Sequence, residues 1–420
     1  MSVCLTGAVV LLVGRPWVRL NLRFLNAQIL EELGGVGYAC FDVVDLARGF
    51  WWRARLGSLD PAPYRAYLEG LASARTPVPT IPPRRKHVVF IQMESVDGLA
   101  LGARYGGRPV MPFLERLARE QVCFANTLDN TAGGRTTDAE LLVLTSLVPL
   151  RRAPAYVSQP LERVPTLPKV LSSAGYDTWS MHGYNGSFWR RAAAHKALGF
   201  AGSLFIEDLD ATDFLGWGVS DASLLAQAAR RLAAAERPSF AHLILLTSHH
   251  PCTYVRERRG LPAKGFVDDY VLSLRYVDES IAAFFAALRT AGILDDCIIA
   301  IFGDHDSANT ALLQRKLERA PAQPLGDSVP LVIHGLRAAP RRIEAVAGLQ
   351  DVPVVVLEEL GLSVPLTFTG NGLGHNGRTV AALHGEVRSA GGRYTRTQPT
   401  VDMETLTELS LRYPERLLSP

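Results

Sequence analysis

From residue 87 onward, short runs of β-forming residues alternate with amphipathic helical segments, and this alternation constrains the fold more than any other feature. We expect strands at residues 87–93, 177–181, 241–247, 297–302 and 329–333. Helices are expected between them, at residues 112–121, 166–174, 268–291 and 351–360. Strands and helices that alternate at this spacing predict an α/β fold with a mostly parallel central sheet flanked by helices.

A proline-rich segment at residues 76–83 marks the clearest domain boundary, because it cannot continue a helix and is typical of an extended linker. Residues 15–84 are therefore interpreted as a helical region that ends in this linker, and residues 85–366 as the α/β domain. From residue 367 the pattern changes to glycine-rich turns and short strands. We interpret residues 367–420 as a small C-terminal β subdomain.

The first 14 residues contain no charged side chain and include the apolar run 9–13. A membrane-spanning helix needs about 20 apolar residues, and a secretory signal needs a basic start and a cleavage site. The segment meets neither requirement. It is either the remnant of a longer membrane segment or a buried apolar element at the edge of a domain.

Charge and cysteine content exclude some classes of protein. Lys and Arg number 44 against 41 Asp and Glu, which gives a net charge of +3, and the longest basic run is residues 84–86. A protein built mainly to bind nucleic acid would carry more basic charge. The five cysteines are scattered and lack C-x-x-C spacing, so neither a zinc ribbon nor a disulfide framework is expected.

Several predicted strands end in side chains that bind metal ions or react. Glu94 follows the strand at 87–93, and Asp304 and His305 follow the strand at 297–302. Functional residues collect beyond the carboxyl ends of strands in open α/β sheets. One such carboxylate alone is more often an ordinary loop residue. Together, carboxylates and an imidazole indicate a site for Mn²⁺, Mg²⁺ or Zn²⁺.

A glycine pair precedes a predicted helix start in residues 130–140. Thr137 and Glu140 have the spacing of a capping box, which predicts that the helix begins at Thr137. The glycines would let the backbone approach a ligand, and the helix N-terminus would suit a phosphate or a sulfate. Thr136 would then present its hydroxyl to that anion. The alternative is an ordinary helix cap.

Five segments together resemble one known family: residues 90–95 (FIQMES), 134–140 (GRTTDAE), 182–191 (HGYNGSFWRR), 247–251 (TSHHP) and 303–305 (GDH). They are similar to the lipoteichoic-acid synthase and phosphoglycerol transferase group, a sulfatase-like branch of the alkaline phosphatase superfamily. The resemblance extends from about residue 85 to residue 365, with the segments in the same order. It implies the alkaline phosphatase/sulfatase-like fold.

The resemblance also implies a role for seven residues. The metal ligands, usually of Mn²⁺ in this family, would be Glu94, Asp304 and His305. Thr136 would be the nucleophile and would also contact the metal. The glycerol phosphate would be held by Trp189, Arg191 and His249.

The chemistry of these side chains agrees with the implied roles. A hydroxyl is a poor nucleophile at neutral pH, and a divalent metal beside Thr136 would favour its alkoxide. Arg191 can pair with a phosphate through two parallel hydrogen bonds, and Trp189 can pack on the glycerol. His249 can protonate a leaving oxygen or bind a substrate hydroxyl. Considered without the resemblance, His249 also fits a structural histidine, and Trp189 fits a core residue. His182, His250, Asp306 and His334 are weaker candidates.

The implied activity is the transfer of phosphoglycerol from phosphatidylglycerol to a glycan or glycerophosphate acceptor, through a phospho-threonine intermediate. The resemblance places the catalytic domain at the membrane surface, on the periplasmic or extracellular side. It thus favours the reading of residues 1–14 as a membrane remnant.

Other activities stay open. A phosphodiesterase or phosphatase would use water in place of the acceptor. Phosphoethanolamine transferases usually carry zinc and several disulfides, which five scattered cysteines do not suggest. A catalytically silent relative would bind a glycan or a lipid.

The sequence also departs from the family pattern. Arg135 stands where lysine is common, and the segment from residue 306 to residue 327 does not follow the family, so the acceptor is not fixed. Residues 131–140 contain no cysteine or serine in a C/S-x-P-x-R setting, so sulfate ester hydrolysis is not expected.

Overall fold

The structure is a computed structural model that describes residues 26–75, 86–150, 154–318, 328–374, 379–381, 387–389, 394–395 and 401–418. The expected membrane remnant at residues 1–14 and the linker at residues 76–83 lie outside these ranges. None of the helices that the structure describes combines the length and the apolar character that a membrane-spanning segment needs.

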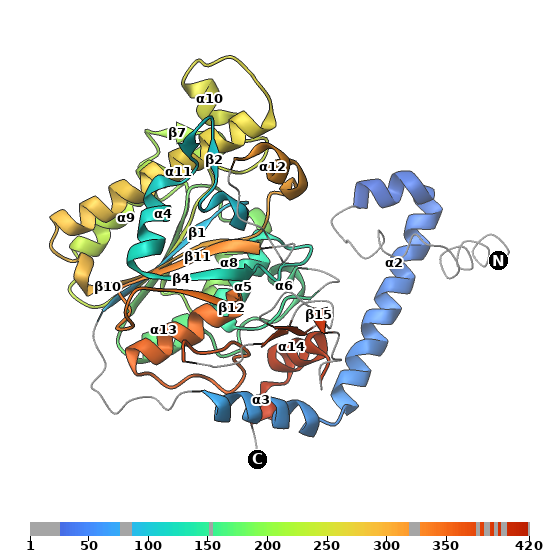
Figure 1. The fold of residues 1–420 in the computed structure, drawn as a ribbon. Coiled ribbons are helices and arrows are strands. Elements are labelled where there is room, and N and C mark those ends of the chain that lie inside the picture. The colour runs from blue at the N-terminus through green and yellow to red at the C-terminus, as the bar shows by residue number, and fades with distance from the viewer. Residues whose placement is uncertain are drawn as a thin grey trace.

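A central eight-stranded sheet organises the described part of the chain (Figure 1). The strand order is β12-β4-β11-β10-β1-β9-β5-β6. Its strands are β1 (His87–Met93), β4 (Val122–Leu128), β5 (Asp177–His182), β6 (Gly202–Leu204), β9 (Ser239–Ile244), β10 (Cys297–Gly303), β11 (Ser328–His334) and β12 (Arg341–Gly348). Neighbouring strands are parallel except where β11 pairs with β10 and β4. The expected α/β fold with a mostly parallel sheet is therefore confirmed.

Alternate residues of β1 point to opposite layers of helices. Val89 and Ile91 belong to a core formed with α4 (Pro112–Glu120), α9 (Asp221–Ala233) and α11 (Phe266–Thr290). Val88 and Phe90 belong to a core formed with α5 (Thr136–Thr145), α7 (Leu167–Ser173) and α13 (Val352–Leu360). Because both faces are covered, the central strands β1 and β10 carry buried, mainly apolar residues on both faces rather than alternating apolar and polar ones.

The shorter elements lie mainly in the connections between these layers. The helices are α6 (Ala155–Ser158), α8 (Arg191–Leu198), α10 (Tyr254–Arg258) and α12 (Thr310–Lys316). The strands form two small pairs, β2 (Arg104–Tyr105) with β3 (Arg108–Pro109), and β7 (Phe214–Leu215) with β8 (Gly218–Val219).

The register of β1 with its neighbours brings the functional strand ends together. Met93 lies opposite Gly303 of β10, and Gln92 lies opposite Ile244 of β9. The residues that follow these strands therefore meet at one edge of the sheet. Strand β9 ends at Ile244, earlier than expected, because the next residues turn toward a buried carboxylate: the Leu246 and Thr247 amides donate to Asp221, at 2.8 and 3.1 Å.

Three strands of the central sheet were not foreseen, namely β4, β6 and β12. Strand β4 contains the polar residues Asn126 and Thr127, and β12 begins with two arginines and contains Glu344. β12 is the last strand at one side of the sheet, where charged side chains reach solvent. Such edge strands lack the apolar run that identifies a buried strand.

The N- and C-terminal helices pack against each other. Helix α2 (Asn26–Ser58), which is interrupted at Gly34 (φ 66°), projects from the body of the molecule and leads to α3 (Ala62–Ala74) (Figure 1). The C-terminal segment contains a three-stranded sheet of β13 (Thr379–Ala381), β14 (Val387–Ser389) and β15 (Tyr394–Thr395). Beyond the expected strands it continues into α14 (Met403–Arg412) and α15 (Pro414–Leu418).

A small separate core joins these helices. It includes Leu56 and Leu68 from the N-terminal helices and Leu406, Leu409 and Leu417 from the C-terminal helices. Arg416 donates hydrogen bonds to the Leu56 carbonyl (2.7 Å) and to the Leu59 carbonyl at the end of α2. The C-terminal helices therefore hold the N-terminal helices on the body.

This packing yields a stability prediction. Leu68 is 0% exposed, so Leu68→Ala leaves a cavity between α3 and the C-terminal helices. We expect it to lower the free energy of unfolding by about 2–5 kcal/mol. Urea unfolding followed by tryptophan fluorescence measures the change, because Trp52 packs against the same core. The exposed neighbour Glu69 provides the control: Glu69→Ala should change the value by less than about 0.5 kcal/mol. Equal stability of the two variants would contradict this packing.

Candidate active site

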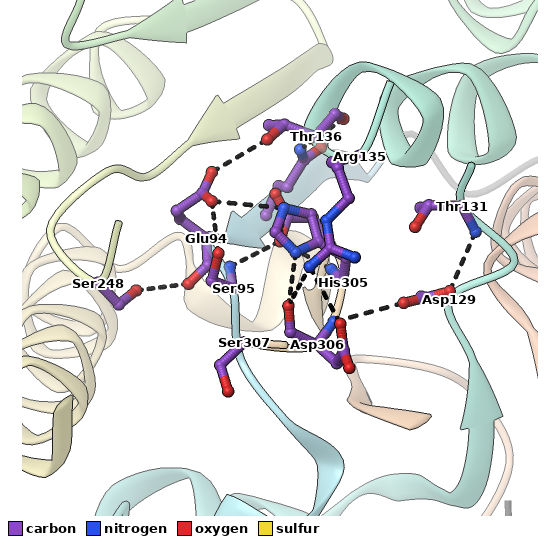
Figure 2. A network of polar contacts seen from close by, with 12 residues as sticks. Glu94, Ser95, Asp129, Thr131, Arg135, Thr136, Ser248, His305, Asp306 and Ser307 are labelled. Atoms are coloured by element: carbon purple, nitrogen blue, oxygen red, sulfur yellow. Dashed lines mark hydrogen bonds and ion pairs between the residues drawn. The ribbon is translucent and has the colours of Figure 1, made fainter. Parts of the chain in front are cut away.

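Glu94, Asp304 and His305 form a buried group at the carboxyl edge of the sheet. Figure 2 shows Glu94 beside His305. Glu94 directly follows β1, and Asp304 and His305 follow the adjacent β10. One ligand atom from each side chain lies within 4.8 Å of the others. The three residues that were expected to bind a metal are thus brought together.

The donor set fits a divalent metal ion. Asp304 Oδ1 accepts hydrogen bonds from the backbone amides of Ser95 (2.7 Å) and His305 (2.8 Å). Asp304 Oδ2 is buried and has no hydrogen-bond partner among the described residues. A buried carboxylate oxygen is costly without a partner, and a cation would supply one. Two carboxylates and an imidazole could therefore hold a metal ion here.

The protonation of this group reflects crowded negative charge. Burial, and then the charge of Glu94, raise the pKa of Asp304 to about 7. Burial alone would lower the pKa of His305, but Asp304 and Glu94 outweigh it and raise this pKa to about 9. Burial also opposes ionisation of Glu94, yet the hydrogen bond and charge of His305 hold its pKa below the ordinary value. A bound cation would relieve the repulsion between the carboxylates.

Thr136 lies directly beside this group. Its Oγ1 donates a hydrogen bond to Glu94 Oε2 at 3.1 Å, as Figure 2 shows. The Thr136 carbonyl also accepts from the Gln92 side chain at 3.2 Å, which ties the start of α5 to β1. The hydroxyl is therefore held at the edge of the metal group, where a nucleophile would be needed.

The predicted capping box is wrong. Helix α5 begins at Thr136, one residue before the expected start, and its N-cap is Arg135 (φ 45°). The Thr137 hydroxyl donates to the Gly134 carbonyl (3.0 Å) instead of accepting from the helix. Glu140 does not reach back to the helix start, because it forms a buried ion pair with Arg191 and a hydrogen bond with His195.

Gly134 makes a close contact within the chain itself. The Asp138 carboxylate accepts from the backbone amides of Ala132 (2.9 Å) and Gly134 (2.8 Å). A Cβ at Gly134 would lie 2.2 Å from Asp138 Oδ1, so only glycine fits. Gly134 also lines the pocket described below, and the approach of a ligand to the glycine pair stays a prediction.

An open pocket contains most of the expected site residues. Its lining includes Glu94, Thr136, Trp189, Arg191, His249 and His305. Asp304 is fully buried and does not contribute to the lining. The residues that the resemblance implied for phosphate binding and for catalysis therefore face one shared space.

Arg191 is held by a buried ion pair rather than lying free in the pocket. Its Nε and Nη2 donate to Glu140 Oε1 at 3.0 and 2.9 Å. His195 Nε2 lies 2.7 Å from Glu140 Oε2. Nη1 of Arg191 is buried without a hydrogen-bond partner in the described part of the chain. Arg191 keeps one nitrogen for a ligand.

His249 lies against an aromatic residue that the sequence did not identify. The rings of His249 and Trp217 are 4.4 Å apart, and Trp217 and Tyr184 both line the pocket. The loop that carries Trp217 lies so close to Gly183 that a Cβ at Gly218 would be 2.0 Å from the Gly183 carbonyl oxygen. The absence of a Cβ at Gly218 therefore allows this close approach. In the sequence, the glycines on both sides of Trp217 were the signal that could have identified it as a residue of the site.

The weaker candidates have different positions. His250 and His182 line the pocket, and burial lowers the pKa of His182 to about 3, so it is neutral. Asp306 accepts a hydrogen bond from Arg135 at 3.0 Å. His334 lies outside the pocket, with its ring 5.4 Å from that of Phe285.

Comparison with known proteins places the chain among related enzymes. The family model for Sulfatase matches residues 86–362. Lipoteichoic acid synthase 2 of Bacillus subtilis (strain 168) is 27% identical over 364 residues, which cover 82% of this chain and 55% of that protein. The lipoteichoic acid synthase of Staphylococcus saprophyticus is 30% identical over 233 residues, which cover 53% of this chain and 36% of that protein. The chain thus spans about half the length, or less, of these relatives.

Solved structures share the fold. The lipoteichoic acid synthase LtaP from Listeria monocytogenes has a TM-score of 0.68 at 20% identity, covering 82% of this chain and 93% of that chain. The Streptococcus pyogenes phosphoglycerol transferase GacH, in complex with sn-glycerol-1-phosphate, has a TM-score of 0.56 at 14% identity, covering 85% of this chain and 93% of that chain.

The donor set predicts metal binding that depends on Asp304. Isothermal titration of metal-free protein with Mn²⁺ should show one site, and Asp304→Asn should weaken binding by roughly 100-fold or more. Asp278→Asn is the matched control, because this buried carboxylate accepts from the Phe113 and Leu114 amides (2.8 Å each) away from the pocket. Equal binding by the two variants would exclude Asp304 as a ligand.

Metal binding should also depend on pH. In the metal-free protein the pKa values of about 7 for Asp304 and about 9 for His305 mean that Mn²⁺ must displace protons from both. Affinity should therefore rise as the pH increases from 6 to 8, with proton release measurable by titration in buffers of different ionisation enthalpy. Affinity that does not change with pH would contradict this arrangement.

Proposed function

This chain belongs to the sulfatase family, and from that premise we propose that it is a metal-dependent phosphoglycerol transferase. The observation that carries the proposal is the Thr136 hydroxyl, 3.1 Å from Glu94 and beside the buried Glu94, Asp304 and His305 group, in a pocket that Arg191 also lines. The likeness to lipoteichoic acid synthases supports it. The donor would be phosphatidylglycerol, and the acceptor a glycan or a glycerophosphate chain.

The first half-reaction would load Thr136. The metal ion, which we propose to be Mn²⁺ held by Glu94, Asp304 and His305, would favour the alkoxide of Thr136 and offset charge on the phosphoryl oxygens. Arg191 Nη1 would donate to a phosphate oxygen, and Trp189 would pack on the glycerol. Thr136 would give up its proton to solvent before the reaction; its Oγ1 would then attack the phosphorus, and the bond from phosphorus to the diacylglycerol oxygen would break. His249 would give that oxygen a proton.

The second half-reaction would return Thr136 to its starting state. A hydroxyl of the acceptor would attack the glycerophospho-threonine, with His249 accepting its proton. The bond between phosphorus and Thr136 Oγ1 would then break, and Thr136 would be free for another cycle. Because the donor is a phospholipid, we place the catalytic domain at the membrane surface, on its periplasmic or extracellular side.

The experiment follows both halves of the reaction. The full chain, loaded with Mn²⁺, is mixed with labelled phosphatidylglycerol, and we expect diacylglycerol release together with one glycerophosphate on Thr136, mapped by peptide mass spectrometry. Thr136→Ala should abolish release and adduct, because the attacking oxygen is lost. Its matched control is Thr145→Val at the other end of α5, where the hydroxyl donates to the Leu141 carbonyl (2.7 Å). This variant should retain most of the activity.

The other outcomes discriminate between the alternatives. Turnover by Thr136→Ala at the normal rate would disprove the nucleophile. Diacylglycerol release with water as the sole acceptor, in the presence of glycans and glycerophosphate chains, would identify a phosphodiesterase. An adduct from phosphatidylethanolamine instead would identify a phosphoethanolamine transferase, and Mn²⁺ binding with no adduct from either lipid would favour a binding protein.

A further inference from the structure

Glu140 is a fully buried carboxylate next to the pocket, and the proposed chemistry gives it no role. The side chains of Glu140 and Arg191 are 0% and 2% exposed. Both oxygens of Glu140 are engaged: Oε1 accepts from Arg191 Nε and Nη2, and Oε2 lies 2.7 Å from His195 Nε2. A buried ion pair is expensive to form, and replacement by apolar residues often costs nothing. A specific function therefore explains the presence of this ion pair better than a contribution to stability does.

This contact fixes which part of Arg191 meets a ligand. Two of the three guanidinium nitrogens bind Glu140, and Nη1 has no hydrogen-bond partner within the described ranges. Arg191 lines the same pocket as Thr136. An arginine side chain that is already held in place loses little conformational freedom when it binds a phosphate oxygen.

The same contact anchors a turn with unusual backbone angles. Trp189 and Arg190, which precede Arg191, have φ angles of 57° and 55°. Residues other than glycine rarely adopt these angles, and they persist only where the surrounding structure enforces them. The Arg191 ion pair immediately follows the turn, and the turn places Trp189 in the pocket lining. By fixing Arg191, Glu140 thus also helps to fix the position of Trp189.

His195 completes the support without adding charge. It lies one helical turn after Arg191 in α8; its Nδ1 is 2.8 Å from Ser180 Oγ, which lies 2.8 Å from Ser203 Oγ. Burial lowers the pKa of His195, so the ring is neutral near pH 7. The charges of Arg191 and Glu140 therefore cancel each other.

Charge is balanced elsewhere in the pocket lining as well. Arg135, the other arginine among the described lining residues, pairs with Asp306 at 3.0 Å. Once a divalent ion has displaced the proton of Asp304, Glu94 and Asp304 would together match its two charges. A pocket without excess positive charge suits a phosphodiester, which carries one negative charge. It is less suited to a phosphomonoester, which carries nearly two at neutral pH.

We propose that Glu140 is a positioning residue that presents Arg191 Nη1 to the substrate phosphate and, by cancelling the charge of Arg191, makes the pocket selective for phosphodiesters over phosphomonoesters. The proposal rests on the proposed function in one respect, namely that this pocket receives a phosphate group.

Two substitutions separate the two effects. Glu140→Gln keeps an acceptor for Arg191 but removes the charge, and its amide group can donate to His195 Nε2 once that ring takes the other neutral tautomer. Glu140→Asp keeps the charge but shortens the side chain, so its hydrogen bonds with Arg191 are lost. Tyr156→Phe is the matched control, because it removes the 3.3 Å contact from the Tyr156 hydroxyl to Glu140 Oε2 and leaves the carboxylate in place.

Binding is measured without turnover. Each substitution is made in the full chain carrying Thr136→Ala, with Mn²⁺ occupancy confirmed. Isothermal titration then compares glycerol 1-phosphate, a monoester, with glycerophosphoglycerol, a diester. The parent should bind the diester at least as tightly as the monoester. Glu140→Gln should shift the ratio of the two affinities toward the monoester by about tenfold, because a nearby negative charge is lost. Glu140→Asp should weaken both probes alike, and Tyr156→Phe should change neither.

Several results would overturn the proposal. A folded Glu140→Gln variant with an unchanged affinity ratio would disprove the selectivity, and a folded Glu140→Asp variant with parental affinities would disprove the positioning. If these variants do not fold, the parent protein alone tests the proposal. A monoester that binds it more than tenfold tighter than the diester would contradict a charge-balanced pocket. The proposed function fails separately, through the absence of a Thr136 adduct from phosphatidylglycerol, and these binding measurements need no turnover.

Discussion

The structure depends on the close approach of two buried carboxylates, Glu94 and Asp304, at the ends of adjacent parallel strands. The pairing of Met93 with Gly303 sets this approach, so the strand register and the site are fixed together. The surrounding chain adapts to the two charges: the Ser95 and His305 amides bind one Asp304 oxygen, and the Thr136 hydroxyl binds Glu94. The Asp304 oxygen that is left without a partner among the described residues suits a cation, which would complete the balance of charge.

Another buried carboxylate, Glu140, lies one turn further along α5 from Thr136. Its ion pair with Arg191 joins this helix to the turn that carries Trp189. Helix α5 is thus held by Glu94 and Gln92 at its first residue and by Arg191 and His195 one turn later. In the function that we propose, this arrangement would fix the attacking hydroxyl and the phosphate-binding nitrogen relative to each other.

The sequence predicted those elements whose side chains are apolar on both faces. The strands β1 and β10 were found within one residue of their ends, because each contains an uninterrupted apolar run, residues 88–91 in β1 and 298–302 in β10. Strand β12 was missed because its position at the edge of the sheet allows charged residues. In the site, the Glu94, Asp304 and His305 group was anticipated from strand ends and from the family resemblance. Glu140 was misread as a helix cap, since its spacing from Thr137 fits a capping box equally well.

By itself, the sequence determined the fold class and the chemistry of the side chains at the carboxyl ends of the strands, because periodicity and residue type are local properties. The tertiary structure alone decided which charges meet. It showed that Glu140 pairs with Arg191, 51 positions away, and that Arg416 binds the end of α2, 360 positions from Leu56. Local spacing does not encode such partners. They follow from the way the helices pack on the sheet, which brings distant buried charges close enough to compensate each other.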